Sequence, residues 1–226
     1  MSCVFFDLDN TLTDRSETVA AYAKVFLQDF ESHLQDGLNA EILGQLLNKL
    51  DAGGYGGHEN RSRALIDRPI WRKPVSSDEL IQHWQNWVPG HSVPMDGMHD
   101  CLQTLEESGY RMALVTNGSS QSQRTKISVL ALASYFDACI ISGEVGCAKP
   151  DSAIFNKAIE IMGCEPGASV FVGDHPVNDY QGSLACGMTP VWFEGRHIWP
   201  HIRPADFSVR KLSELPGVIH QILRSN

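Results

Sequence analysis

Five short apolar runs recur along the chain with helical stretches between them, and this alternation restricts the fold more than any other feature. The runs are CVFFDLD at 3–9, YRMALVT at 110–116, ACIIS at 138–142, SVFVGD at 169–174 and TPVWFE at 189–194. Continuous apolar strands are typical of a parallel sheet that is covered on both faces. The intervening stretches 98–107, 120–132, 151–162 and 177–186 are predicted to be helices. The pattern therefore predicts βαβ units in an α/β, Rossmann-like core with a parallel sheet.

One long segment, residues 14–94, breaks this alternation. Its stretches 18–34 and 40–50 are amphipathic, and 76–88 begins with the Ser-x-x-Glu signature of a helix start. A crossover connection needs only one helix. We therefore expect a separate helical domain at 14–94, inserted into a core of 1–13 and 95–226.

Composition and charge restrict the partners and the compartment. The net charge of −9 argues against a nucleic-acid or membrane-surface role. No apolar run reaches transmembrane length, and Asp7 and Asp9 interrupt any signal peptide, so a cytoplasmic protein is expected. The six cysteines contain no C-x-x-C pair, which favours free thiols in a reducing compartment over a zinc site.

Polar residues follow four of the predicted strands. They are Asp7 and Asp9 after the first, Thr116 to Ser119 after the second, Lys149 after the third, and Asp174 and Asp179 after the fourth. Ligands of open parallel sheets bind at the carboxyl ends of the strands. Four carboxylates converging there would repel one another without a cation, and oxygen ligands suit Mg²⁺. We therefore predict a Mg²⁺ site formed by Asp7, Asp9, Asp174 and Asp179.

Two further features at this edge predict a phosphate site. Lys149 precedes Pro150 and a helical run, so it is expected near the N-cap, where a cation cannot cap the helix. Residues that break a local rule are expected at functional sites, and this ammonium group can bind a phosphate. The Thr116–Ser120 turn offers hydroxyl groups and free helix amides, which together bind anions.

Four motifs in order, FDLDNT, VTNG, CAKPD and GDHPVND, resemble those of the haloacid dehalogenase (HAD) superfamily. The helical insertion after the first motif resembles the C1 cap of its subfamily I phosphatases. The resemblance covers essentially the whole chain. It implies a Rossmann-like core with a five-stranded parallel centre.

The resemblance also implies roles for individual residues. Asp7 is similar to the nucleophile that forms an aspartyl-phosphate, and Asp9 to the general acid/base, whose backbone carbonyl also binds Mg²⁺. Thr116 is similar to the phosphate-binding hydroxyl, with Asn117 and Gly118 beside it.

The remaining motif residues complete this site. Lys149 is similar to the lysine that bridges nucleophile and phosphoryl group, and Asp174 and Asp179 to acidic residues at the metal. The acid at position 9 favours phosphoryl transfer over carbon–halogen cleavage, because dehalogenases have no leaving oxygen to protonate.

These observations together predict a Mg²⁺-dependent phosphatase acting on a small soluble phosphomonoester, as a monomer or homodimer. Sugar phosphates, phosphoglycolate-like acids and nucleoside monophosphates are open as substrates. A phosphomutase and a non-catalytic HAD-like binding protein are the alternatives.

The glycine-rich segment 51–63 in the helical insertion is predicted to be a flexible loop that contacts the leaving group. Its candidate specificity residues are His58, Arg61 and Arg63; the alternative is a mobile exposed turn with solvated arginines. The tryptophans of the insertion are predicted to be core residues: Trp71, Trp84 and Trp87.

Overall fold

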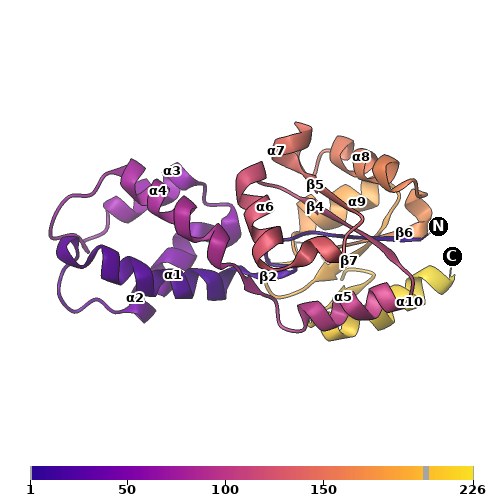
Figure 1. The fold of residues 1–226 in the computed structure, drawn as a ribbon, viewed down its shortest axis with the longest axis horizontal. Coiled ribbons are helices and arrows are strands. Elements are labelled where there is room, and N and C mark those ends of the chain that lie inside the picture. Colours follow the sequence, from indigo (N-terminus) through magenta and orange to yellow (C-terminus); the bar gives the residue numbers. More distant parts are fainter. Residues whose placement is uncertain (1, 201–203, 226) are drawn as a thin grey trace. The chain divides into compact units, whose positions relative to one another are not determined.

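The computed structural model describes residues 2–200 and 204–225, and the chain divides into two compact units (Figure 1). One unit comprises Met1–Thr13 and Pro94–Asn226, and the other is the continuous segment Asp14–Val93. The sequence analysis places the second boundary one residue later, after residue 94. The two units are called the core unit and the helical unit below.

A sheet of 6 strands in the order β5-β4-β1-β6-β7-β8 forms the centre of the core unit. Its strands are β1 (Cys3–Phe6), β4 (Arg111–Thr116), β5 (Ala138–Ile141), β6 (Ser169–Gly173), β7 (Thr189–Phe193) and β8 (Ser208–Val209). All neighbouring pairs are parallel. The predicted α/β, Rossmann-like fold is therefore confirmed. The sequence analysis missed β8, because two residues are too short to show a period.

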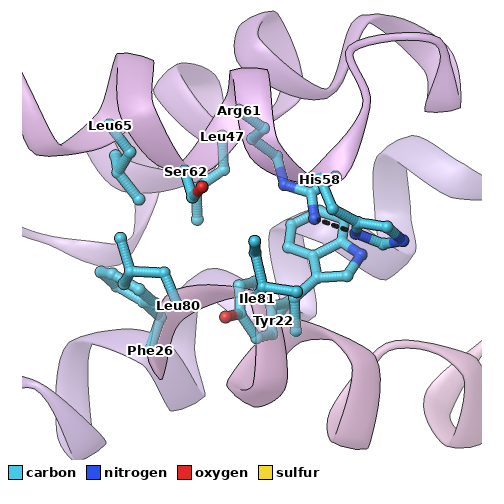
Figure 2. A pocket seen from close by; sticks show the side chains of 10 residues that line it. Tyr22, Phe26, Leu47, His58, Arg61, Ser62, Leu65, Leu80 and Ile81 are labelled. Carbon is cyan, nitrogen blue, oxygen red and sulfur yellow. Dashed lines mark hydrogen bonds between the residues drawn. The ribbon is translucent and has the colours of Figure 1, made fainter. Parts of the chain in front are cut away.

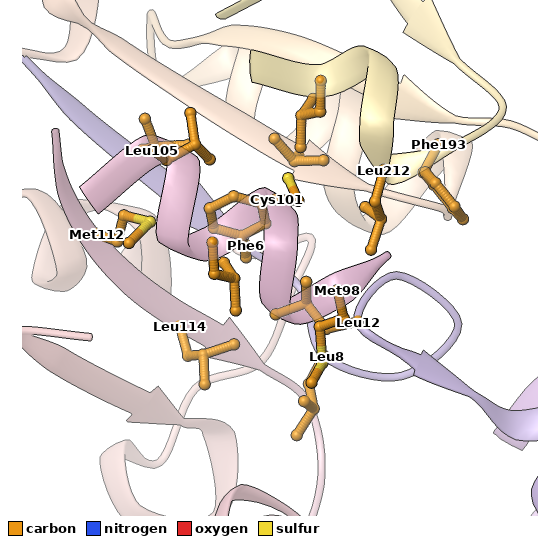
Figure 3. Close-up of a cluster of buried hydrophobic side chains, with 14 of the residues drawn as sticks. Phe6, Leu8, Leu12, Met98, Cys101, Leu105, Met112, Leu114, Phe193 and Leu212 are labelled. Atoms are coloured by element: carbon orange, nitrogen blue, oxygen red, sulfur yellow. The ribbon is translucent and has the colours of Figure 1, made fainter. Parts of the chain in front are cut away.

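Alternate side chains of β1 enter two different hydrophobic clusters, as expected for a strand buried on both faces. Val4 and Phe6 pack in a cluster with residues of α5 (Met98–Glu107) and α10 (Leu215–Ser225). Figure 3 shows Phe6 beside Cys101 and Leu105 of α5. Cys3 and Phe5 pack in the other, with residues of α8 (Ser152–Met162). The helices therefore cover both faces of the sheet (Figure 1).

The helices nearest the predicted site differ from the sequence analysis in four respects. Lys149 is not at the N-cap of α8: Asp151 is, and its carboxylate accepts from Ala153 N. The helix predicted over 177–186 is a π-helix at Pro176–Gln181 followed by α9 (Gly182–Ala185). Helix α6 (Ser120–Val129) ends earlier than predicted, and α7 (Ser142–Val145) is an unpredicted single turn. The wider π turn places Asp179, which periodicity alone could not predict.

Four helices make the helical unit: α1 (Arg15–Asp29), α2 (Ala40–Asp51), α3 (His58–Ile66) and α4 (Ser77–Trp87). Ser76 caps α4 by accepting from Glu79 N, as its sequence signature predicts. Trp84 is buried in the core of this unit, and Trp71 and Trp87 pack against that core, so their predicted role is confirmed. Two short strands, β2 (Thr13–Asp14) and β3 (Val93–Pro94), pair where the chain crosses between units.

The prediction of a loop over 51–63 is wrong. Its first part contains a 3₁₀ turn at Ala52–Gly54, and α3 begins at His58. Gly57, with φ of 69°, allows the turn that starts this helix. Glycines dominated the sequence pattern, but they are confined to the turn before the helix.

Two other sequence predictions concern thiols and membranes. All six cysteines are free, as predicted. Burial raises the pKa of Cys101 to about 12, so its thiol stays protonated. Within the described ranges, no helix has the length and apolar content needed to cross a bilayer.

Candidate active site

Asp7 directly follows β1, and its N–H continues the sheet pairing by donating to Val172 O at 2.9 Å. Beyond it the chain turns sharply: Asn10 has φ of 64°, and the N–H groups of Leu12 and Thr13 both donate to Leu8 O. Asparagine tolerates this left-handed conformation better than most residues. The turn separates the two aspartates, so Asp7 stays at the sheet edge while Asp9 lies in the turn.

Three carboxylates meet at the carboxyl ends of β1 and β6. Asp7, Asp174 and Asp179 are all buried, and each offers an oxygen that lies within 4.8 Å of the others'. Strands β1 and β6 are neighbours, with Phe6 level with Val172, so the residues that follow them reach the same place. The predicted meeting of carboxylates at this edge therefore holds for three of the four aspartates.

Lys149 supplies a cation to this cluster. Its Nζ lies 2.7 Å from Asp7 Oδ1 and 2.7 Å from Asp179 Oδ1, and its side chain is buried. Burial lowers the pKa of Lys149, but the charges of Asp179 and Asp7 outweigh burial and raise it above its usual value. The lysine is therefore held as an ammonium group between two carboxylates.

The loop that carries Lys149 is tied to the second motif through Asn117. The Lys149 N–H donates to Asn117 Oδ1 at 2.9 Å, and Asn117 Nδ2 donates to Lys149 O at 2.9 Å. The amide of Asn117 thus fixes the backbone of Lys149 through two hydrogen bonds. Gly118 N donates to Ser142 Oγ at 2.9 Å, and the role of Gly118 in phosphate binding stays a prediction.

One ammonium group leaves the three carboxylates with an excess of negative charge. Burial raises the pKa of Asp7 well above its usual range, and burial raises that of Asp174 to about 6. The buried Oδ2 of Asp174 makes no hydrogen bond of good geometry in the described part of the chain, and its neighbour there is His197 Nε2 at 3.3 Å. A buried, negatively charged set of three carboxylates whose oxygens lie within 4.8 Å of one another fits Mg²⁺.

The position of Asp179 depends on a glycine. A Cβ on Gly173, the last residue of β6, would lie 2.4 Å from Asp179 Cγ. Asp179 Oδ2 also accepts from His175 N at 2.9 Å. The carboxylate can therefore sit against the strand only because residue 173 has no side chain.

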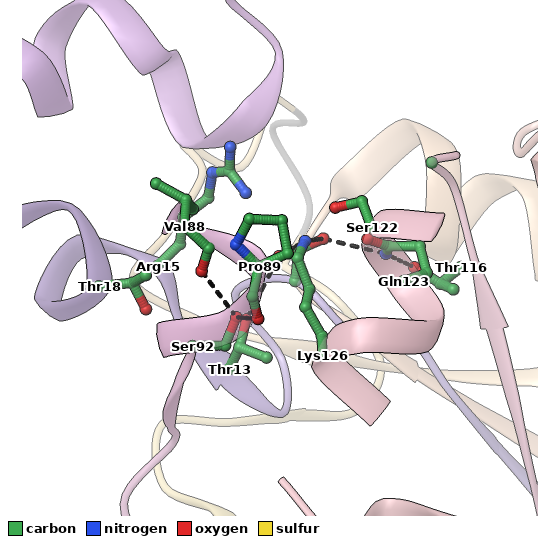
Figure 4. Close-up of polar contacts among 12 residues, drawn as sticks. Thr13, Arg15, Thr18, Val88, Pro89, Ser92, Thr116, Ser122, Gln123 and Lys126 are labelled. Atoms are coloured by element: carbon green, nitrogen blue, oxygen red, sulfur yellow. Dashed lines mark hydrogen bonds and ion pairs between the residues drawn. The ribbon is translucent and has the colours of Figure 1, made fainter. Parts of the chain in front are cut away.

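Asp9 lies in a different environment from the three-carboxylate cluster, which corrects the prediction that all four carboxylates meet. Its two oxygens accept from Lys126 Nζ at 2.7 and 2.6 Å. Gln123 Nε2 donates to Asp9 Oδ2 at 3.1 Å. It also donates to Thr116 Oγ1 at 2.6 Å (Figure 4). The Asp9 carboxylate is thus held beside the predicted phosphate-binding hydroxyl of Thr116.

A model of the haloacid dehalogenase-like hydrolase family matches residues 4–193. The chain belongs to this family. The resemblance seen in the four motifs is confirmed, and so is the prediction of a hydrolase of this family.

Several relatives extend over nearly the whole of this HAD-like hydrolase. It is 26% identical to a glyceraldehyde 3-phosphate phosphatase of Pyrococcus furiosus, covering 99% of this chain and 93% of the relative. It is 29% identical to the N-acylneuraminate-9-phosphatase of Mus musculus, covering 97% and 94%. Among solved structures, the HAD hydrolase YfnB of Bacillus subtilis, bound to magnesium, matches with a TM-score of 0.75. The match is 21% identical and covers 97% of this chain and 98% of YfnB, and it shows a shared fold.

The candidate specificity residues of this HAD-like hydrolase lie on α3 in the helical unit. Arg61 is buried, with Nη1 3.1 Å from Asp51 Oδ1 and its guanidinium 3.6 Å from the centre of the Trp84 ring. Its Nη2 donates to His58 Nδ1, and both residues line a pocket within this unit (Figure 2). Arg63 is exposed beside Glu59. The alternative of an exposed turn with solvated arginines is therefore wrong for Arg61.

The sequence analysis missed four residues around the site. Gln123 and Lys126 are polar residues of α6, yet both are buried. The sequence could have indicated them, because two polar residues three positions apart lie on the same face of a helix as the apolar residues that pack on the sheet. His197 Nε2 lies 3.3 Å from Asp174 Oδ2, and its ring lies 4.6 Å from that of His175. The interaction with Asp174 raises the pKa of His197. No motif marks His197, because it follows the last predicted strand.

Proposed function

We propose that this HAD-like hydrolase is a Mg²⁺-dependent phosphatase that hydrolyses a small phosphomonoester through an aspartyl-phosphate on Asp7. The observation that carries the proposal is the buried Asp7 carboxylate, bound to Lys149 and grouped with Asp174 and Asp179. Its phosphatase relatives in Pyrococcus furiosus and Mus musculus support the same reaction class. Asp7, Asp174 and Asp179 would hold Mg²⁺, with the backbone carbonyl of Asp9 as a further ligand. The ion would offset the charge of the phosphoryl oxygens.

Asp7 acts as the nucleophile in this proposal. One of its oxygens attacks phosphorus, and the bond from phosphorus to the leaving oxygen breaks. Lys149, whose Nζ donates a hydrogen bond to Asp7 Oδ1, orients that carboxylate and offsets the charge of the incoming phosphoryl group. The Thr116 hydroxyl and the remaining N–H of Asn117 bind phosphoryl oxygens.

Asp9 moves the protons. It donates one to the leaving oxygen and then accepts one from the water that hydrolyses the aspartyl-phosphate, which restores Asp7 and releases phosphate. An acid at this position is needed for an alkoxide leaving group and has no task in halide release. This distinction favours a phosphatase over a dehalogenase.

We also propose that the helical unit selects the leaving group through His58 and Arg61, which line its pocket. Arg63, which is exposed beside Glu59, contributes less. His58→Ala is expected to change the ratio of kcat/KM between substrates, and Arg63→Ala to leave it within about twofold. Equal ratios in both variants and the wild type would rule out this assignment. The cytoplasmic location and the monomeric or homodimeric state stay predictions.

The decisive experiment measures phosphate release from a panel of phosphomonoesters with Mg²⁺ and with a chelator. Asp7→Asn is expected to abolish release while leaving the circular dichroism spectrum unchanged, because an amide cannot attack phosphorus. Asp100→Asn, at an exposed position of α5, is the matched control. Full turnover by Asp7→Asn, or turnover that persists in the chelator, would contradict the proposal. Transfer of phosphate within the substrate without release would indicate a phosphomutase.

A further inference from the structure

Two side chains of α6 hold the Asp9 carboxylate from one side. Gln123 and Lys126 are three positions apart, so they project from the same face of the helix about one turn from each other. Gln123 is 1% exposed and Lys126 4% exposed. Burying these two polar side chains costs desolvation free energy that an apolar side chain at the same positions would not cost.

The hydrogen bonds of Gln123 fix the direction of the Thr116 hydroxyl. Its Nε2 has two N–H groups and contacts two oxygens, Asp9 Oδ2 at 3.1 Å and Thr116 Oγ1 at 2.6 Å. An ionised carboxylate only accepts, so the amide nitrogen must face Asp9. Thr116 Oγ1 then accepts the second N–H, and its own proton is free to donate to a phosphoryl oxygen.

Lys126 contacts both oxygens of Asp9. Its Nζ lies 2.7 Å from Oδ1 and 2.6 Å from Oδ2. When one oxygen carries the proton that is to be donated, the other still accepts from the ammonium group. The carboxyl group can therefore keep its position in both halves of the reaction.

We infer that Gln123 and Lys126 are positioning residues that hold the proton-transfer group Asp9 and the phosphate-binding hydroxyl of Thr116 in one fixed arrangement. The inference rests on the proposed function, because it assigns Asp9 the proton transfers described there. In the first step Asp7 bonds to phosphorus, the bond to the leaving oxygen breaks, and the Asp9 proton passes to that oxygen. A misplaced Asp9 slows this step only when the leaving oxygen needs the proton.

The test compares two leaving groups. The substrates are p-nitrophenyl phosphate, whose leaving group needs no proton, and the best alkyl phosphomonoester of the panel, whose leaving group does. Lys126→Met is expected to lower kcat for the alkyl ester by about 10- to 100-fold, with KM within about twofold and a smaller loss for the aryl ester. Lys157→Met, exposed on α8, is the control and is expected to match the wild type.

A second arm separates positioning from a general structural role. In an Asp9→Asn background, Lys126→Met is expected to cause no further loss of kcat with p-nitrophenyl phosphate, because it acts through Asp9. An equal loss for both substrates, or a loss that persists in the Asp9→Asn background, would overturn the inference.

Three further results of these measurements also bear on the inference. If Lys126→Met does not fold by circular dichroism, Gln123→Leu is measured instead, with the same selective loss expected and an added rise in KM through Thr116. An active wild type with an unchanged variant would overturn this inference alone. A wild type that releases no phosphate from any ester would overturn the proposed function as well.

Discussion

The two units of the molecule each bury a cluster of charged side chains, and the two clusters have opposite excess charge. In the core unit, Lys149 lies among three carboxylates. In the helical unit, Asp51 lies between two guanidinium groups, with Arg15 Nε at 2.6 Å and Arg61 Nη1 at 3.1 Å. In formal charges, the core cluster therefore has an excess of two negative charges and the helical cluster an excess of one positive charge.

The helical unit compensates its excess charge with its own groups. Arg61 lies over the Trp84 ring and donates to His58, and burial lowers its pKa to about 10. In the core unit, the nearest cationic group to the buried Asp174 Oδ2 is His197 Nε2 at 3.3 Å, and burial raises the pKa values of the Asp7 and Asp174 carboxyl groups. The comparison favours a fold-supporting role for the helical cluster and is consistent with the Mg²⁺ site proposed for the core cluster.

The largest expected effect follows from removing the cation of the core cluster. Lys149→Met is expected to lower kcat/KM by about 10³-fold, equal to about 4 kcal/mol, because the ammonium group orients Asp7 and offsets phosphoryl charge. Phosphate release from the best substrate is the measurement. Lys157→Met on α8 is the control, and a loss of less than about tenfold in Lys149→Met would contradict the role given to this residue.

The matching change in the helical unit is Asp51→Asn, which removes the buried carboxylate that pairs with both Arg15 and Arg61. It is expected to destabilise this unit by about 3 kcal/mol. Urea denaturation followed by tryptophan fluorescence measures the change. Glu59→Gln, in an exposed ion pair with Arg63, is the control and should change stability by less than about 0.5 kcal/mol. Equal urea denaturation midpoints for Asp51→Asn and Glu59→Gln would contradict a structural role for the cluster.

Mg²⁺ distinguishes the two clusters directly. At about 100 times its Kd, the ion is expected to stabilise the folded wild type by about 2.7 kcal/mol, because it binds the folded carboxylates. Asp174→Asn should lose most of this gain and Asp51→Asn should keep it. Thermal melting with and without Mg²⁺ checks both variants. A gain in Asp174→Asn that equals the wild-type gain would show that the ion binds elsewhere.

The smallest expected effect comes from one added methyl group. Gly173→Ala would place a Cβ 2.4 Å from Asp179 Cγ, so the carboxylate must move away. Mg²⁺ affinity should fall about tenfold, or about 1.4 kcal/mol, since displaced supporting groups weaken metal sites by 10- to 100-fold. Gly167→Ala is the control, because a Cβ there meets nothing within 4 Å. Unchanged Mg²⁺ titration curves in Gly173→Ala would contradict the proposal that Gly173 makes room for the Asp179 carboxylate.

The sequence predicted the sheet and the position of the three-carboxylate cluster well. Apolar runs mark five strands to within two or three residues, and parallel strands bring the residues that follow them to one edge. Asp7 and Asp174 directly follow strands β1 and β6, so sequence position alone places them. Lys149 also reaches the cluster, although its expected N-cap position is wrong.

The rest of the site depends on contacts that a local pattern does not contain. Asp9 is two residues from Asp7, yet its carboxylate is directed to Lys126 by the turn at Asn10 and by the packing of α6. Arg61 was expected in a loop, because the glycines before α3 conceal the helix start. In both cases a partner distant in the sequence decides where the side chain lies.

The central place of β1 in the sheet has a consequence for folding. Residues 3–6 are the first strand of the chain, but they pair with β4 and β6, and Asp7 meets Lys149 across 142 positions of sequence. The helical unit is one continuous segment, so all of its internal contacts become possible once residues 14–93 have been made, whereas the core needs slow pairing of strands from both ends of the chain. During synthesis the first strand must therefore wait for β6 to leave the ribosome, and catalytic competence is among the last properties that the chain acquires.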